Sequence, residues 1–191
     1  MDILLITGPP YSGKGTQCEI LEAELGYTHI STGDVIREEK ARQTPIGRLM
    51  QQYEEKGELV PDEVMEELLE NILLAHKQDK GIILDGYPRT IPQVDTLLRI
   101  LQRNGLSISH AVNINVPAEE LLERAKKRAA TSDRLDDRNE QTHLKRIGIF
   151  EKETRPAIRY LETLVPLAQV DGLGTIPEIT EKLRHIMQQA R

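Results

Sequence analysis

The sequence predicts an α/β fold, a three-layer α/β/α domain with a central parallel sheet that carries a P-loop. Short apolar runs alternate along the chain with longer stretches of helical periodicity, and this order is typical of a parallel sheet covered by helices on both faces. A glycine-rich segment, 8–14, stands between the first apolar run and the first helical stretch. Because 191 residues fit one domain, we expect a single domain over 1–191.

The expected strands are short runs that are apolar on both faces, as in a strand buried between two layers of helices. These runs comprise residues 3–6, 82–84, 111–116 and 167–170, and residues 28–30 are expected to add one more short strand. The expected helices lie between them and repeat apolar residues three or four positions apart. They comprise residues 14–25, 61–76, 117–128, 140–152 and 176–187. Gly26 is well suited to end the first helix, and Pro61 to begin the second.

Two segments interrupt this alternation. Residues 31–60 are mostly helical in pattern and contain no expected strand, whereas residues 129–139 are short, polar and charged. We expect both to be insertions over an edge of the sheet.

Composition and charge limit the partners. The net charge of −6 argues against a general nucleic-acid binder, and 3% aromatic residues without tryptophan leave few surfaces on which bases could stack. No apolar run approaches the roughly 18 residues of a membrane-spanning helix. The N-terminus has no basic region before its first apolar run. We therefore expect no nucleic-acid partner, no membrane association and a cytoplasmic location.

The single cysteine limits disulfides and metals. One Cys cannot form an intramolecular disulfide or a zinc site built from a cysteine cluster. The five histidines are scattered along the chain, and we expect them on the surface or in the core rather than as metal ligands. No zinc is therefore expected.

Residues 8–14, Gly-Pro-Pro-Tyr-Ser-Gly-Lys, fit the pattern GxxxxGK. In such a loop backbone N–H groups surround a phosphate, the N-terminus of the next helix adds partial positive charge, and the lysine reaches the outer phosphates. Gly15 stands where many P-loops carry the Ser or Thr that binds Mg²⁺. The next hydroxyl is at Thr16, which we expect to donate to phosphate.

Further motifs identify a resemblance to a known family. They are Gly-Lys-Gly-Thr-Gln-Cys at 13–18, Ser-Thr-Gly-Asp at 31–34 with Arg37, Gly-Glu-Leu-Val-Pro at 57–61, and Leu-Asp-Gly-Tyr-Pro-Arg-Thr at 84–90 with Gln93. In order and spacing they resemble the adenylate kinases among the nucleoside monophosphate kinases, over nearly the whole chain. The resemblance implies transfer of the terminal phosphoryl group of ATP to AMP, giving two ADP, with Mg²⁺. It also implies that 31–60 is the NMP-binding insertion and 127–138 a short lid.

The resemblance assigns roles to individual residues. The catalytic cations are expected to be Lys14, Arg89, Arg128, Arg134 and Arg146. ATP is expected to contact Tyr11, Ser12, Gly13, Lys14, Gly15, Thr16, Arg124, Arg128 and Gly174. AMP is expected to contact Thr32, Arg37, Glu58, Leu59, Val60, Gly86, Tyr87, Pro88, Arg89, Gln93, Arg134 and Arg146. Asp85 is expected to hold Mg²⁺ through water. Because all the arginines come from one chain, we expect a monomer.

The chain departs from the family pattern at several positions. Tyr11 replaces a glycine of the P-loop, Asp133 replaces a glycine beside Arg134, and Arg138 is an extra residue before Asn139. Because the matching glycine can take a positive φ cheaply, we expect Tyr11 in an unusual backbone conformation, with its ring lying outward over the phosphate entrance.

Two other functions are considered. UMP/CMP kinases share the scaffold, but such relatives tend to have Ala where Thr32 stands and Asn where Thr90 and Gln93 stand, so the acceptor is expected to be AMP. A regulator that binds nucleotides without catalysis would be expected to lack Lys14, Arg89 or the lid arginines, all of which are present.

Overall fold

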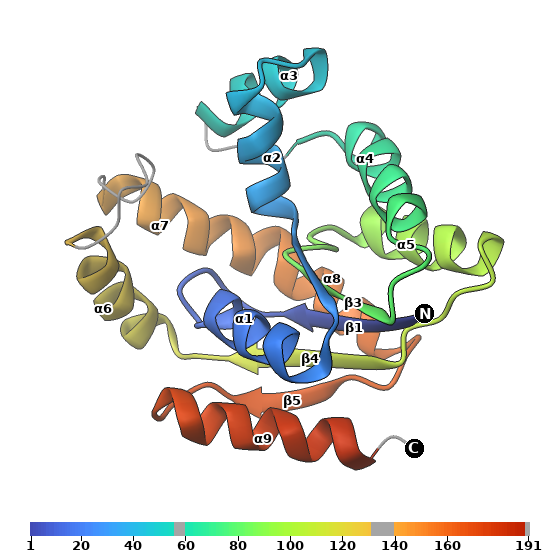
Figure 1. Cartoon of the computed structure of the whole chain (residues 1–191). Coiled ribbons are helices and arrows are strands. Elements are labelled where there is room, and N and C mark those ends of the chain that lie inside the picture. Colours follow the sequence, from blue (N-terminus) through green and yellow to red (C-terminus); the bar gives the residue numbers. More distant parts are fainter. Residues whose placement is uncertain (56–59, 131–139, 190–191) are drawn as a thin grey trace.

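The structure is a computed structural model that describes residues 1–55, 60–130 and 140–189 (Figure 1). Its centre is a five-stranded sheet in the order β2-β3-β1-β4-β5, and every pair of neighbouring strands is parallel. The strands are β1 (Asp2–Thr7), β2 (Thr28–Ser31), β3 (Gly81–Asp85), β4 (His110–Asn115) and β5 (Ala168–Asp171). The predicted α/β class with a central parallel sheet is confirmed.

Helices cover both faces of this sheet (Figure 1). The helices of the described residues are α1 (Lys14–Leu25), α2 (Thr32–Ala41), α3 (Pro45–Glu55), α4 (Asp62–Ala75), α5 (Ile91–Arg103), α6 (Ala118–Ala129), α7 (Glu140–Ile149), the π-helix η2 (Phe150–Thr154), α8 (Arg155–Glu162) and α9 (Ile176–Gln189). In the described part of the chain, no helix has both the length and the apolar character needed to cross a membrane.

The core consists of two hydrophobic clusters, one on each face of the sheet. Successive residues of a strand point to opposite faces. Thus Ile3 and Leu5 of β1 pack with side chains of α4, α5 and α8, whereas Leu4 and Ile6 pack with side chains of α1, α6 and α9. These four residues are completely buried. Burial of both faces explains why the strand reads as an unbroken apolar run.

Helices α5 and α8 are not among the helices expected from the sequence. The hydroxyl of Thr90 caps α5 by accepting a hydrogen bond from the backbone N–H of Gln93, at 3.3 Å. Pro156 has no N–H to donate, so it argues for a helix that ends near Lys152. The chain instead passes through η2 and continues as α8, because a π-helix can absorb such an interruption of the α-helical hydrogen bonds.

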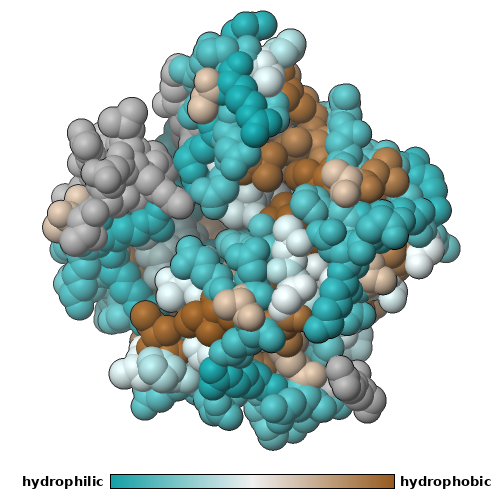
Figure 2. All heavy atoms as spheres, in the orientation of Figure 1, coloured by the Kyte–Doolittle hydropathy of each residue, from teal (hydrophilic) through white to brown (hydrophobic). Residues whose placement is uncertain are grey.

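The carboxyl ends of three neighbouring strands meet at one edge of the sheet. The P-loop follows β1, Ser31 ends β2 and Asp85 ends β3. Helices α2 and α3 rise above this edge, beside α4 (Figure 1). Figure 2 shows a mostly hydrophilic face, with hydrophobic residues where α2 and α3 stand next to α4. In doubly wound sheets this edge is where ligands bind.

Candidate active site

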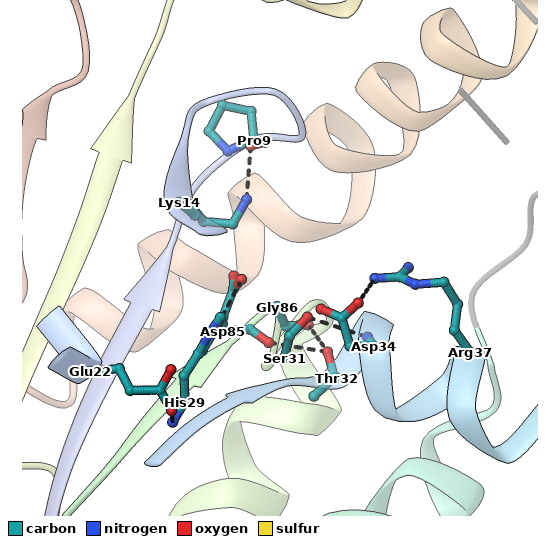
Figure 3. Close-up of polar contacts among 10 residues, drawn as sticks. All are labelled: Pro9, Lys14, Glu22, His29, Ser31, Thr32, Asp34, Arg37, Asp85 and Gly86. Atoms are coloured by element: carbon teal, nitrogen blue, oxygen red, sulfur yellow. Dashed lines mark hydrogen bonds and ion pairs between the residues drawn. The ribbon is translucent and has the colours of Figure 1, made fainter. Parts of the chain in front are cut away.

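The P-loop turns tightly between β1 and α1. The backbone N–H of Ser12 donates to the carbonyl of Pro9 at 3.3 Å, and Gly13 begins α1 in the left-handed conformation, with φ of 89°. The Nζ of Lys14 donates to the same Pro9 carbonyl at 2.9 Å (Figure 3). The hydroxyl oxygen of Ser12 is buried, with no hydrogen-bond partner among the described residues. The first turn of α1 therefore presents N–H groups and an ammonium group at the sheet edge, as an anion site requires.

Lys14 and Asp85 form the electrostatic centre of this edge. Burial lowers the pKa of Lys14, and Asp85 opposes that effect. Burial acts to raise the pKa of Asp85, but His29, Lys14 and Arg89 outweigh it, so the carboxyl pKa is lowered and the group is ionised. The imidazole of His29 lies on the other side of Asp85, with 3.7 Å between Nε2 and Oδ2 (Figure 3).

Cys18, His29 and Asp85 bring three potential metal ligands together, each with a ligand atom within 4.8 Å of the other two. Cys18 faces the core, where burial raises its thiol pKa well above the ordinary value. The three residues come from α1, β2 and β3, so their proximity depends on the fold and is not visible as a spacing in the sequence.

The loop after β3 is held against α2 and α5. The hydroxyl of Thr32 donates to the carbonyl of Gly86 at 3.0 Å, and Nε of Arg89 donates to that carbonyl at 2.6 Å. The side chain of Gln93 accepts from the backbone N–H of Arg89 at 2.8 Å and donates to Asp62 at 2.7 Å. Thr32 and Gln93, both expected to contact AMP, therefore hold this loop in place.

Arginines from several elements converge on the P-loop. Arg37 of α2 pairs with Asp34 one turn earlier (Figure 3). Arg124 of α6 donates to the carbonyls of Ser12 at 3.3 Å and Gly172 at 2.9 Å, so it joins the P-loop to the loop after β5. Arg128 of α6 and Arg146 of α7 both lie against the ring of Tyr11.

Of the two predictions made for Tyr11, the one about its backbone conformation is confirmed and the one about its ring is not. Its φ is 67°, in the left-handed region that non-glycine residues rarely adopt. The ring does not lie outward: Tyr11 is 8% exposed and packs with the side chains of the second core cluster. The prediction of an outward ring is wrong because the ring packs inward, against Arg128 of α6 and against His143 and Arg146 of α7.

Two cavities, of about 240 and 480 Å³, meet beside the P-loop. Of the predicted AMP residues, the smaller cavity is lined by Arg37, Val60, Gly86, Tyr87, Pro88, Arg89, Gln93 and Arg146. Of the predicted ATP and metal residues, the larger one is lined by Tyr11, Gly13, Lys14, Gly15, Thr16, Asp85, Arg124 and Arg128. Both cavities share the four cationic side chains of Lys14, Arg37, Arg89 and Arg146.

Some predicted site residues lie elsewhere. Ser12, Thr32 and Gly174 are not among the described residues that line either cavity. Glu58, Leu59 and Arg134 lie outside the described residues, as do the departures at Asp133 and Arg138.

The smaller cavity has an apolar wall that was not predicted from the sequence. It consists of Ile36, Met65, Ile149 and Phe150. Phe150 opens the π-helix, and single π turns within helices often lie at functional sites. The π-helix carries no obvious sequence signal, apart from the proline that follows it.

Comparison with known proteins identifies the family. A family model described as Adenylate kinase matches residues 6–165 of the chain. The chain belongs to the adenylate kinase family. The "Adenylate kinase" of Parabacteroides distasonis is 39% identical over 188 residues, covering 98% of each chain. That of Bacteroides fragilis is 41% identical over 180 residues, covering 94% of this chain and 95% of the relative. That of Thermus thermophilus is 39% identical over 181 residues, covering 95% and 94%.

Membership of the adenylate kinase family confirms the resemblance inferred from the motifs. It also confirms the predicted enzyme class, a nucleoside monophosphate kinase, since the similarity extends over nearly the whole chain.

Proposed function

We propose that the larger cavity binds ATP, that the smaller one binds AMP, and that the phosphoryl group is transferred where the two cavities meet. The observation that carries this proposal is the set of cations lining both cavities: Lys14, Arg37, Arg89 and Arg146. Phosphoryl transfer brings many negative charges together, and its catalysis is mainly positioning and charge stabilisation. A junction of cations between two cavities supplies both.

In the proposed reaction an oxygen of the AMP phosphate forms a bond to the terminal phosphorus of ATP. The bond from that phosphorus to the β-phosphate oxygen breaks, and two ADP result. Lys14, Arg128 and Arg146 stabilise the phosphates of ATP, while Arg37 and Arg89 hold the phosphate of AMP. Arg134 is proposed to join them from the lid. Guanidinium groups suit this work because each can donate two parallel hydrogen bonds to phosphate oxygens.

Mg²⁺ fits the chemistry of the larger cavity. Asp85 lines it with an ionised carboxylate, and hard oxygen ligands are the ones Mg²⁺ prefers. Mg²⁺ usually keeps several waters and takes phosphate oxygens as ligands, so we propose that Asp85 holds it through water. Bound with ATP, the ion supplies charge neutralisation at the phosphates.

We propose AMP as the acceptor because Thr32, Thr90 and Gln93 match the adenine-selective pattern rather than that of UMP/CMP kinases. All four shared cations belong to one chain, which supports a monomer, and we propose a cytoplasmic location.

The test is a panel of initial rates with ATP and Mg²⁺ plus AMP, CMP, UMP or GMP, detected by coupled measurement of ADP. We expect AMP to be the fastest acceptor. An Arg89→Met variant serves as the control that the activity belongs to this site. A faster rate with CMP or UMP would favour the UMP/CMP kinase alternative, and no turnover with any acceptor would favour a non-catalytic regulator.

A further inference from the structure

The side chain of Tyr11 joins the P-loop to α7 by a hydrogen bond between two buried groups. Its hydroxyl lies 2.6 Å from Nδ1 of His143, and the two rings meet edge to face, with centroids 5.2 Å apart and an interplanar angle of 84°. Tyr11 is 8% exposed and His143 is 3% exposed. A buried hydrogen bond between two packed rings holds both side chains in one orientation.

Two arginines of the proposed phosphate site rest on the same ring. The guanidinium carbon of Arg128 lies 5.7 Å from the ring centroid, and that of Arg146 lies 5.3 Å from it. Both distances are within the range of cation–π interactions. Arg146 follows His143 by three positions on α7, so the two residues lie on the same face of that helix. The ring of Tyr11 in the P-loop therefore contacts one arginine from α6 and one from α7.

The backbone of Tyr11 adopts a conformation that is unfavourable for a residue with a side chain. A non-glycine residue at φ of 67° carries a conformational cost, and such a residue persists only where its surroundings hold it in place. The contacts with His143, Arg128 and Arg146 are what the side chain gains in that conformation.

We propose that Tyr11 is a positioning residue for phosphoryl transfer: it fixes Arg128 and Arg146 at the phosphate groups and sets the place of α7 relative to the P-loop through His143. The proposal rests on the proposed function, which assigns both arginines to the phosphates. Groups held in place before the reaction stabilise the transition state without further reorganisation. Loss of the ring that holds the two arginines therefore lowers kcat rather than the affinity for ATP.

Two substitutions of Tyr11 separate the hydroxyl from the ring. Tyr11→Phe removes only the hydrogen bond to His143, and kcat should fall about two- to tenfold, the range of one neutral hydrogen bond. Tyr11→Leu also removes the aromatic surface under both arginines, and kcat should fall about tenfold or more. In both variants KM for ATP should stay within about twofold of the unchanged protein. Tyr160→Phe, which removes an exposed hydroxyl bonded to Asp95, is the matched control and should leave kcat unchanged.

A double-mutant cycle tests whether Tyr11 acts through Arg146. Arg146→Met should lower kcat less in the Tyr11→Leu background than in the unchanged protein, because the arginine is already misplaced there. Full additivity of the two effects would overturn the proposal. So would unchanged kcat in both Tyr11 variants, or a raised KM for ATP alone, which would make the ring a nucleotide contact.

The outcomes also separate this inference from the function beneath it. If Arg128→Met and Arg146→Met leave kcat intact, the assignment of the arginines to the phosphates fails. If they lower kcat and the Tyr11 variants do not, only the positioning role fails. Should Tyr11→Leu not fold, Tyr11→Phe still decides, because the ¹⁵N shift of His143 Nδ1 reports the bond directly. That shift should change in Tyr11→Phe and not in Tyr160→Phe.

Discussion

Lys14, a half-buried cation that lines both cavities, is the residue on which the proposed phosphate site depends most directly. Replacing it with methionine should lower kcat by roughly a hundredfold or more, the scale of losing one aligned donor in a transition state. The fold should survive, because a methionine of similar length can occupy a site where burial already disfavours the ammonium group.

Steady-state rates and thermal unfolding of the Lys14→Met protein check this together. Lys126→Met is the control, since Lys126 has a side chain 59% exposed and forms only a surface ion pair with Glu123. A folded Lys14→Met protein with nearly normal turnover would contradict the assignment of the P-loop.

Gly86 stands where the loop after β3 passes closest to the predicted AMP residues. Its φ is 81°, and an added Cβ would lie 2.9 Å from the hydroxyl of Thr32 and 3.1 Å from a guanidinium nitrogen of Arg89. Gly86→Ala should therefore destabilise the fold by about 1 kcal/mol or more and raise KM for AMP, because Arg89 must move.

Denaturant unfolding and AMP saturation curves measure both effects. Gly148→Ala is the matched control: apart from its chain neighbours and the backbone of α7, no described atom lies within 4 Å of a Cβ added at Gly148, so alanine should be neutral or stabilising there. Equal stability and equal KM for AMP in the two variants would show that the close approach at Gly86 is unimportant.

At the residue scale, the position of a side chain could be predicted where a local motif has a known backbone geometry. The GxxxxGK pattern placed Lys14 at the turn between β1 and α1, where the structure has it. It failed for the ring of Tyr11, because His143 lies 132 positions away along the chain and no local pattern shows that the two meet. Side-chain partners from distant elements are set by packing, which a single sequence does not display.

The N-terminus of α9 is held by a local pair of hydrogen bonds. A carboxylate oxygen of Glu178 accepts from the backbone N–H of Thr175 at 2.7 Å and from its hydroxyl at 2.9 Å, the arrangement of half a capping box. These bonds lower the pKa of Glu178. The same carboxylate lies beside Gly174, an expected ATP contact: a Cβ added there would lie 2.8 Å from an oxygen of Glu178.

Glu178→Ala should lower the melting temperature, and the difference should depend on pH. A lowered folded-state pKa stabilises the fold above the unfolded value of about 4.3, so the difference should be fully present above about pH 5 and shrink as the pH falls further. Melting curves over that range check the sign. Glu123→Ala, which removes a surface ion pair, should show little difference at any pH; an equal loss in both variants would contradict the capping role.

At the scale of helices and strands, prediction depended on how regular the hydrophobic pattern of each element is. All five strands were expected; the pattern is clearest for β1, β3 and β4, whose burial on both faces makes each a largely apolar run, and weaker for the partly exposed edge strands β2 and β5. The first helix was expected over Lys14–Leu25, which are its observed bounds. Helix α8 was missed because Pro156 normally ends a helix, and local rules do not show that a π turn can absorb it.

At the scale of the whole molecule, we expect 31–60 and 127–138 to close over the two nucleotides. Domain closure around ligands is established for adenylate kinases as a family. Here, α2 and α3 rise above the sheet edge that carries the cavities (Figure 1). Closure would exclude water from a phosphoryl group that could otherwise be hydrolysed.

Small-angle scattering tests closure with a bisubstrate analogue, two adenosines joined by five phosphates. The radius of gyration should fall on saturation with the analogue and not with adenosine alone. The Lys14→Met protein should need a higher concentration of the analogue for the same change. Identical scattering curves with and without saturating analogue would count against closure.

The order of strands in the sheet also bears on how the chain is made. β1 lies between β3 and β4, and its first pairings join Asp2 to Gly81 and Leu4 to His110. During translation at about 5–20 residues per second, the apolar run Ile3–Ile6 therefore waits roughly 4 to 15 s for its first partner strand to leave the ribosome. By then α1, which packs with Leu4 and Ile6, and α4, which packs with Ile3 and Leu5, have already been synthesised. The central strand is thus synthesised well before either of its partner strands, and in that interval only helix packing can bury its apolar side chains.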